Sequence, residues 1–392
     1  MLDPHQLENT KENYYKFLIS MEAIAGSYKL TSLSETSPFA RCFAIFGLNL
    51  LKDEKKLSAD SELLAKSIRK DLDLLRHERM KLGIELKFDK SYLQLLAFSL
   101  SALCILNCLT IDPLEDHVAP LVSRDIVKDL NHSGCLEGKP QSGNQAMFKA
   151  IILCHAKEFL NFDVDDLLTD WQNAHLESMN KFGFWGSYTS MTHLQFQNGY
   201  HQYEIFDYLK TPDVPRAISA KSIQMLADHD GHFAPYPGGG GCFDYDAIFI
   251  ITSEGNESAI KYKDLITRTA SSLFMEQNLD GGFCETRKVR PLSIMNFVFT
   301  IKHVLQVDGR ARIERLKYAL SLVRPKNKRI HTHWTDYSRS WDESNLWDSW
   351  FRMLTLARID VALNPSRFSN WGFIDFPGIG FHSLLDSKKI NK

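Results

Sequence analysis

The sequence alternates between two kinds of predicted helix, and this alternation constrains the fold more than any other feature. Stretches such as FARCFAIFGLNLL, YLQLLAFSLSALCIL and AMFKAIILCHA are apolar on nearly every side, whereas ELLAKSIRKDLDLLRHERM and RIERLKYALSLV are amphipathic and charged. A helix that is apolar all round must be surrounded by protein, and an amphipathic helix shows one face to water. Two concentric rings of helices meet both requirements. We therefore predict an all-α toroid of alternating inner and outer helices, built from about six helical hairpins.

A sequence repeat supports this arrangement. The segments NKFGFWG, DHDGHFAP and LDGGFCE place Phe184, Phe233 and Phe283 at spacings of 49 and 50 residues. Each segment follows an amphipathic stretch and precedes an apolar one, which for the third segment is residues 292–306. Repeated helical pairs of this period bury their apolar faces only by stacking on their neighbours. We therefore expect residues 1–392 to form a single toroid domain.

The two ends of the chain have separate places in this prediction. Residues 1–35 supply the first outer-helix region. Residues 364–392 contain WGFIDFPGIGFH, which is too apolar for a free tail, so this C-terminal segment is expected to pack back on the toroid.

Composition excludes several functional classes. The 46 basic and 48 acidic residues give a net charge of −2, so no overall field attracts the protein to nucleic acid, and no nucleic-acid partner is expected. The seven cysteines are an odd number, as expected for buried thiols in a reducing compartment. The N-terminus carries acidic residues early and lacks the basic and apolar regions of a secretory signal. These features predict a cytoplasmic protein.

One stretch is long enough to cross a membrane. Ser91–Ile111 contains no charged residue. Its polar side chains, among them Gln94 and Asn107, favour a buried helix of a helical protein over a membrane span. Peripheral contact with a membrane stays open as a prediction.

Two motifs carry a family resemblance. Gln277–Glu285 (QNLDGGFCE) resembles the Gln/Trp repeat motif of squalene and terpenoid cyclases, which protein prenyltransferase β subunits contain in looser form; Phe283 stands at the tryptophan position. In those families the motif lies between an outer and an inner helix of an α/α toroid. The segment Asp244-Tyr245-Asp246-Ala247 resembles a shortened Asp-x-Asp-Asp-Thr-Ala motif, which holds the catalytic acid of class II terpenoid cyclases.

The resemblance implies a protonation-initiated cyclase acting on a small isoprenoid. In this interpretation Asp246, aided by Asp244, protonates an alkene or epoxide. Two carboxyl groups this close raise the pKa of one of them, so that it can serve as an acid. An aromatic wall would stabilise the resulting cation. The residues expected to form this wall are Trp185, Tyr200, Tyr203, Phe243 and Tyr245.

Alternative interpretations of this segment stay open. Asp244 is equally suited to cap the helix, with Asp246 in its first turn favoured by the helix dipole. A prenyltransferase zinc site needs Asp, Cys and His; Asp244 and Cys242 could supply two ligands, but RKVRPLSIMNF holds no histidine. We predict no metal site, and the absence of nucleotide-binding fingerprints predicts no cofactor.

A second polar cluster supports a different chemistry. Gln197–Glu204 (QNGYHQYE) opens a predicted inner helix, and positions 197, 201 and 204 share one face. Buried polar groups cost free energy unless they face a wet cavity or pair with one another. In a uronate polysaccharide lyase, an epimerase or a glycoside hydrolase, Asn198 would neutralise a carboxylate while His201, Tyr200 or Tyr203 removes a proton. A hydrogen-bonded core network is the structural alternative, and a noncatalytic binding toroid is a third class.

Polar residues also precede two other apolar helices. Inner helices that all begin at one mouth aim their positive dipole ends there and favour an anionic group of an isoprenoid or oligosaccharide substrate. The catalytic candidates are Asp244, Asp246, His201, Tyr203 and Glu204. The substrate-binding candidates are Asn144, Gln145, Trp185, Gln197, Asn198, Tyr200, Phe243, Tyr245, Arg287, Arg290 and Asn345. The repeat register predicts that Asn144, Asn198, His201, Glu204, Asp244, Asp246 and Asn345 converge on one cavity.

Overall fold

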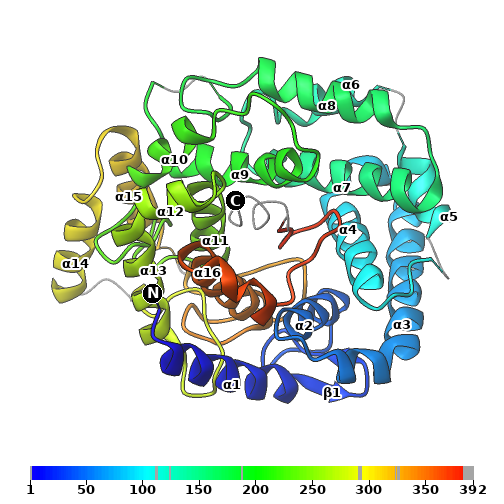
Figure 1. The fold of residues 1–392 in the computed structure, drawn as a ribbon, viewed down its shortest axis with the longest axis horizontal. Helices are drawn as coiled ribbons and strands as arrows, with labels where there is room; N and C mark the ends of the chain where they lie inside the picture. The colour runs from blue at the N-terminus through cyan, green and yellow to red at the C-terminus, as the bar shows by residue number, and fades with distance from the viewer. Residues whose placement is uncertain are drawn as a thin grey trace.

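An inner ring of apolar helices forms the centre of the molecule (Figure 1). The computed structural model describes residues 2–110, 114–122, 125–186, 189–289, 294–322, 324 and 327–382. The inner helices are α2 (Pro38–Leu50), α4 (Lys90–Ile105), α7 (Ser142–Leu160), α9 (His193–Tyr208), α11 (Gly241–Ile251) and α16 (Leu346–Leu363). They pack on one another in this order, and α16 contacts both α11 and α2, which closes the ring. The predicted all-α toroid of inner and outer helices is confirmed.

Amphipathic helices surround this ring. They are α1 (Pro4–Ser20), α3 (Glu54–Lys81), α6 (Ile126–Ser133), α8 (Asp165–Glu177), α10 (Arg216–Gln224) and α13 (Lys263–Glu276). The contrast in burial follows the contrast in sequence. Along α3 only Leu57, Leu64, Ile68 and Leu72 are buried, whereas every residue of α4 from Tyr92 to Leu103 is buried. The two rings therefore differ in burial. The inner helices are apolar on nearly every side, whereas the outer helices carry apolar residues along one face.

Short elements connect the helices. They are β1 (Glu22–Ile24), β2 (Ser27–Tyr28), η1 (Leu86–Phe88), α5 (Glu115–Val118), η2 (Ala119–Leu121), α12 (Asn256–Lys261) and η4 (Pro365–Asn370). The strands β1 and β2 pair in an antiparallel hairpin. The apolar stretch that begins at Ser91 forms the buried inner helix α4. Among the described residues, no helix has both the length and the apolar character needed to cross a membrane.

One helix was predicted in the wrong ring. Residues 292–306 were expected to form the inner helix after the third repeat segment, but α14 (Ile294–Val304) and α15 (Gly309–Ser321) form a hairpin on the outside of the ring (Figure 1). Val298 and Phe299 are 64% and 67% exposed. The inner position is taken by α16, because Phe283 forms a β-bridge with Asn345, the residue that caps α16. The chain therefore returns to the ring at Asn345, and α14 and α15 lie outside it.

Three equivalent turns connect an outer helix to the segment before an inner one. In each turn a backbone N–H donates to the carbonyl four residues later, at 2.7 to 2.8 Å, and the glycine between them has φ between 80° and 88°. The donors are Asn180, Asp228 and Asn278, and the glycines are Gly183, Gly231 and Gly281. In this register the aromatic residues that follow are Trp185, Phe233 and Phe283. Trp185, rather than Phe184, is therefore the first member of the aromatic repeat. These three turns are called the repeat turns below.

Two segments contact the ends of the inner helices. At the C-terminal ends of the inner helices, the carbonyl of Pro377 accepts hydrogen bonds from His155 Nε2 (3.0 Å) and Ser101 Oγ (3.3 Å). At the other end, Trp334 Nε1 donates to Gln94 Oε1 at 3.2 Å, and its ring lies 4.6 Å from that of Trp347. Residues 371–382 and the loop that contains Trp334 therefore lie against opposite ends of the inner helices.

The contact between α7 and α9 gives a test of this packing. A Cβ on Gly143 would lie 1.7 Å from the backbone oxygen of Asn198. Alanine favours a helix over glycine by about 1 kcal/mol, but here it would force two inner helices apart, at a cost of about 1–3 kcal/mol or more. We expect Gly143→Ala to lower the free energy of unfolding in urea, and the adjacent Asn144→Ala to leave it nearly unchanged. A stabilised Gly143→Ala protein would contradict the close packing of these helices.

Candidate functional site

Two carboxylic acids lie buried within the ring, one on α9 and one on α11. Glu204 is 2% exposed and Asp246 is 1% exposed. Glu204 Oε1 accepts hydrogen bonds from Tyr245 Oη (2.8 Å) and from the backbone N–H of Gly380 (3.4 Å). Within the described chain, Glu204 Oε2 and Asp246 Oδ1 have no hydrogen-bond partner. A buried carboxyl oxygen without a partner marks a place where a proton or a ligand can sit.

Burial favours the protonated form of both acids. It raises the pKa of Glu204 to about 8, although the hydrogen bond from Tyr245 opposes this shift. Burial also raises the pKa of Asp246 well above its ordinary range, and Glu204 raises it further when it is ionised. Because Glu204 Oε1 already accepts two hydrogen bonds, the proton of the neutral acid belongs on Oε2. The pair therefore offers neutral acids in a site of low polarity.

Tyr245, which donates to Glu204, belongs to a group of packed aromatic rings. The ring of Tyr245 lies 6.3 Å from that of Tyr200, 6.1 Å from Phe249 and 5.4 Å from Phe351. Phe351 in turn lies 4.4 Å from Trp347. Such rings exclude water and present faces that attract a cation. The interior therefore combines proton donors with a wall suited to positive charge.

Three further polar atoms on α9 lack partners among the residues that the structure describes. They are Asn198 Nδ2, Tyr200 Oη and His201 Nδ1. Asn198 Oδ1 accepts from the backbone N–H of Gly143 at 2.8 Å, which joins α9 to α7. Burial, reinforced by the positive charge of Lys90, lowers the pKa of His201 to about 3. His201 is therefore neutral and can accept a hydrogen bond at its free nitrogen.

Asp244 belongs to a separate ionic cluster. Its Oδ2 lies 2.8 Å from His232 Nδ1 and 3.2 Å from Arg352 Nη1, and its Oδ1 accepts from the backbone N–H of Phe233. Ser349, the corresponding fourth residue of α16, accepts from the N–H of Phe283 in the same way. Asp244 therefore joins the start of α11 to the second repeat turn.

This ionic cluster stays charged at neutral pH. Burial alone would lower the pKa of His232, but the carboxylates of Asp244 and Glu276 outweigh it and raise that pKa to about 10. Burial would likewise raise the pKa of Glu276, but His232 and Arg352 lower it to about 2. Glu276 is therefore ionised and His232 is charged at neutral pH, and both carboxylates of the cluster are paired with His232 and Arg352.

Several predicted site residues point away from the acids. Tyr203 Oη donates to the carbonyl of Gly183 at 2.6 Å and contacts Ser219 of the outer helix α10. Trp185 Nε1 donates to the carbonyl of His175 on α8 at 2.9 Å. Both side chains therefore lie between the rings, because they occupy the outward side of α9 and a repeat turn. Phe243 packs against Phe196 and Tyr236 near the start of α11.

The remaining candidates lie at the rim or beyond it. Asn345 Oδ1 accepts from the N–H of Asp348 and so caps α16. Gln145 lines a surface pocket of about 300 Å³ with Lys90 and Lys139. Arg287 donates to the carbonyl of Gln277 in the third repeat turn. Arg290 lies outside the described residues. The predicted convergence of seven residues on one cavity thus stays a prediction.

The rim of the ring is partly open to solvent. Five side chains from α7, α9, α11 and α16 are half-buried, although most of their neighbours on these helices are buried: Asn144, Gln197, His201, Cys242 and Trp347. All five lie in the first three turns of their helices, so polar and aromatic side chains meet solvent at this end. Half-buried residues also occur at the other end of these helices, among them Phe159 and Tyr208.

Sequence analysis missed the buried arginines of α16. Arg358 is 5% exposed; its Nε donates to Thr252 Oγ1 at 2.9 Å, and its guanidinium lies 4.0 Å from the centre of the Phe249 ring. Its positive charge lowers the pKa of Glu204, against the larger effect of burial. A lone arginine inside the apolar stretch MLTLARID was the signal that could have revealed it.

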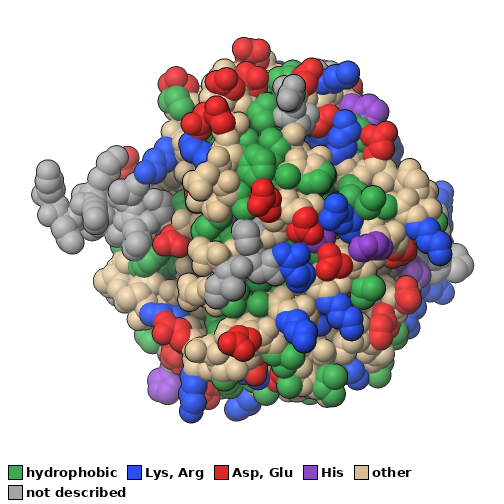
Figure 2. Space-filling model, turned by 90° about the vertical axis from the view of Figure 1, so that its right-hand side faces the viewer, with side chains coloured by type: hydrophobic (Ala, Val, Ile, Leu, Met, Phe, Trp, Pro, Cys, Tyr) green, Lys and Arg blue, Asp and Glu red, His purple; other side chains and the backbone are tan. Residues whose placement is uncertain are grey.

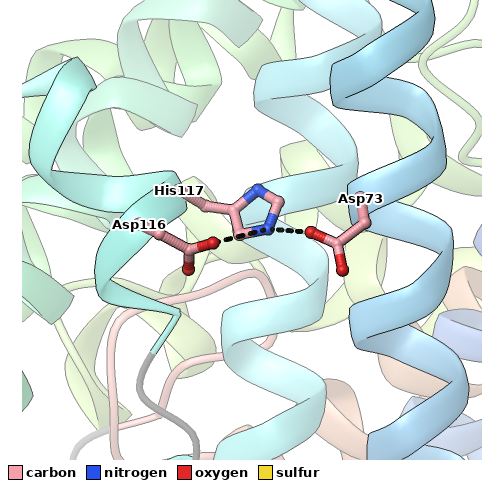
Figure 3. Close-up of side chains that lie close together, drawn as sticks. All are labelled: Asp73, Asp116 and His117. Carbon is pink, nitrogen blue, oxygen red and sulfur yellow. Dashed lines mark hydrogen bonds and ion pairs between the residues drawn. The ribbon is translucent and has the colours of Figure 1, made fainter.

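A group of potential metal ligands lies outside the ring (Figure 3). Asp73 of α3 with Asp116 and His117 of α5 place three ligand atoms within 4.8 Å of one another. His117 Nε2 lies 3.1 Å from Asp73 Oδ1, and its Nδ1 lies 2.9 Å from Tyr92 Oη. Asp116 also pairs with Arg76 at 3.5 Å. Arg76 offsets the negative charge that would attract a cation to this group. The three side chains therefore form a hydrogen-bonded cluster.

The surface on this side carries no large area of one charge. Figure 2 shows this face of the molecule, with lysine and arginine side chains interspersed among aspartate and glutamate. Mixed charge of this kind gives no strong local field for a polyanion.

The pKa of Glu204 predicts a pH-dependent stability. The folded protein keeps a proton on this group up to about pH 8, whereas the unfolded chain releases it near 4.5. Stability therefore falls as the pH rises between these values, by up to ~1.4 kcal/mol per unit. Glutamine cannot release a proton, so Glu204→Gln is expected to be less sensitive to pH in urea unfolding over this range. The exposed Glu62→Gln should keep the wild-type slope; equal slopes for all three proteins would contradict the burial of a neutral Glu204.

Fold and site together define an all-α toroid with buried acids at its centre. No known protein family matches the sequence, and no curated protein is similar to it. Among solved structures, the chain is similar to the type II terpene cyclase MstE from Scytonema in its apo form, with a TM-score of 0.44 and 10% identity, over 92% of this chain and 99% of that chain. A likeness at this level concerns the course of the chain and not its activity.

Proposed function

We propose that the protein is a terpenoid cyclase-like enzyme that starts the cyclisation of an isoprenoid by protonation. The observation that carries the proposal is the pair of buried acids, Asp246 and Glu204, each with an oxygen that lacks a partner in the described structure and each with a raised pKa. An acid that keeps its proton at neutral pH inside an aromatic enclosure is suited to protonate a carbon–carbon double bond or an epoxide.

Asp246 is assigned the acid role and Glu204 the partner role. Transfer of the carboxyl proton to the substrate leaves a carboxylate on Asp246 and a carbocation on the substrate. The new negative charge on Asp246 is not repelled by Glu204 while Glu204 stays protonated, and the faces of Tyr200, Tyr245 and Phe249 stabilise the cation. Loss of a proton from a carbon beside the cation ends the reaction, so product and substrate are isomers. Asp244 is assigned a structural role instead of aiding the acid, because both of its oxygens are engaged.

Coverage of the ring supports the same chemistry. A carbocation is destroyed by water, and residues 371–382 lie against the C-terminal ends of the inner helices, where the N–H of Gly380 reaches Glu204. The half-buried rim at the opposite end is the side from which we propose that substrate enters.

A carbohydrate-active enzyme is the second candidate. The free Asn198 Nδ2 and His201 Nδ1 would suit a uronate carboxylate and the proton beside it. The mainly aromatic wall around the acids favours the isoprenoid, because it offers few hydrogen bonds to a sugar.

Isotope incorporation tests the proposal. The protein is incubated in D₂O with linear isoprenoids that end in an alkene or an epoxide, with and without a diphosphate, and separately with uronate oligosaccharides. We expect a cyclic isomer carrying a single non-exchangeable deuterium, since the carboxyl proton exchanges with solvent before transfer to carbon. Mass spectrometry detects the label. Turnover of only the oligosaccharides would transfer the assignment to the cluster around His201, and no turnover of any substrate would indicate a binding toroid.

A further inference from the structure

A separate cavity lies outside the ring, between the α14–α15 hairpin and the loops that follow the second and third repeat turns. We call it the hairpin pocket. Its volume is about 560 Å³, within the range of small-molecule sites. Phe299 and Tyr318 line it from the hairpin, and Tyr236 and Arg287 line it from the ring side. Neither acid of the ring interior lines it, so the hairpin pocket is independent of the proposed cyclase site.

One part of the pocket wall is apolar. The ring of Tyr236 lies 4.9 Å from that of Tyr318 and 5.2 Å from that of Trp341. Ala319 and Leu322 extend this wall along α15. Phe299 lines the pocket from α14 and is 67% exposed. Large apolar side chains that remain exposed beside a cavity favour an apolar ligand.

The acidic groups of the pocket already have partners within the protein. Asp230 Oδ2 accepts from Lys288 Nζ at 2.8 Å. Asp228 Oδ1 accepts from the backbone N–H groups of Asp230 and His232, each at 2.9 Å. Arg315 is engaged as well, because its Nη atoms donate to the carbonyls of His303 and Leu226. These groups therefore hold the walls together and leave no net negative charge in the pocket.

Two cations remain available to a ligand. Lys302 forms no hydrogen bond or ion pair with any part of the chain that the structure describes. Arg287 uses Nε and Nη2 to bind Asn278 and Gln277, and its Nη1 forms no such contact there. His303 also lines the pocket, and its Nε2 lacks a partner among described residues. The hairpin pocket thus combines an apolar wall with unpaired positive charge.

We propose that the hairpin pocket binds an anionic amphiphile, a molecule with a single hydrocarbon chain and a phosphate or carboxylate head. The chain would lie against Tyr236, Tyr318 and Leu322, and the head would be bound by Lys302 and Arg287. This ligand follows from charge complementarity: a neutral hydrocarbon would leave both cations unused, and a small inorganic anion would leave the aromatic wall uncovered.

Calorimetric titration with dodecyl phosphate, below its micelle concentration, tests the proposal. We expect one site per chain, and at least about tenfold weaker binding of dodecanol and of inorganic phosphate. The double variant Arg287→Ala/Lys302→Ala should also weaken the binding of dodecyl phosphate by at least about tenfold. Ala319→Trp, which fills the pocket, should abolish binding. The control Lys66→Ala/Lys70→Ala, on the exposed side of α3, should bind as the wild type does.

Further measurements identify the source of the head group and test whether the ligand binds in the hairpin pocket. Sedimentation with phosphatidic acid vesicles, lost in the Ala319→Trp variant, would support the site and identify a membrane lipid as the source. Binding of free dodecyl phosphate without vesicle binding would support it and identify a soluble amphiphile. Equal affinity for inorganic phosphate, no binding at all, or binding unaffected by Ala319→Trp would overturn the proposal. Asp246→Asn should leave this binding unchanged, which separates the result from the test of the proposed cyclase.

Discussion

Replacement of Asp246 by asparagine is expected to reduce cyclase turnover by about 10³-fold or more, the scale of a lost general acid. Asparagine keeps the shape of the side chain but has no proton to transfer to carbon. The fold should survive, because burial already favours the neutral form of Asp246 and Asp246→Asn buries no new charge. Product formation by mass spectrometry and the thermal midpoint by circular dichroism are measured on the same preparation.

Asp360→Asn is the matched control for this variant. Asp360 is 2% exposed on α16 and accepts hydrogen bonds from Arg367 and from Trp371 Nε1. Its replacement should lower stability but keep the activity of the folded protein, because it does not contact the acid pair. Full activity in Asp246→Asn on a verified substrate would remove Asp246 from the acid role.

Replacement of Arg352 by methionine is expected to cost about 3–5 kcal/mol of unfolding free energy, the usual effect of breaking a buried ion pair. Arg352 Nη1 lies 3.0 Å from Glu276 Oε2 and 3.2 Å from Asp244 Oδ2. Its Nη2 donates to the carbonyls of Gly238 and Glu285. Methionine fills much of the space that Arg352 occupies. It leaves the carboxylates of Asp244 and Glu276 with His232 as their remaining buried cation.

Two companion variants separate charge from geometry. Arg352→Lys keeps the positive charge but not the planar fork, so an intermediate loss is expected. Arg312→Met removes an ion pair with Asp308 in which the two side chains are 42% and 96% exposed, and should cost less than ~1 kcal/mol. Urea unfolding measures all three. Similar small losses for Arg352→Met and Arg312→Met would contradict the view that Arg352 joins α16, α11 and α13.

The buried site was only partly predictable. Asp244 and Asp246 are two positions apart on one helix, about 200° around its axis, so the sequence requires them to face different sides. It does not say which of them faces the ring interior. The carboxylate of Asp244 contacts the side chains of His232 and Arg352, which lie 12 and 108 residues away in the sequence. The carboxyl group whose charge raises the pKa of Asp246 belongs to Glu204, which sequence analysis had placed in a separate cluster.

The sequence by itself determined the two rings, because all-round apolar helices can be buried only inside a layer of amphipathic ones. It also determined the repeat turns, whose glycines adopt positive φ at low cost. Only the tertiary structure decided which apolar helix occupies the last inner position. The sequences of α14 (Ile294–Val304) and α16 (Leu346–Leu363) are both mainly apolar, so local pattern does not distinguish these helices. The bridge between Phe283 and Asn345 does, since it joins the third repeat turn directly to α16 and leaves α14 and α15 outside the ring.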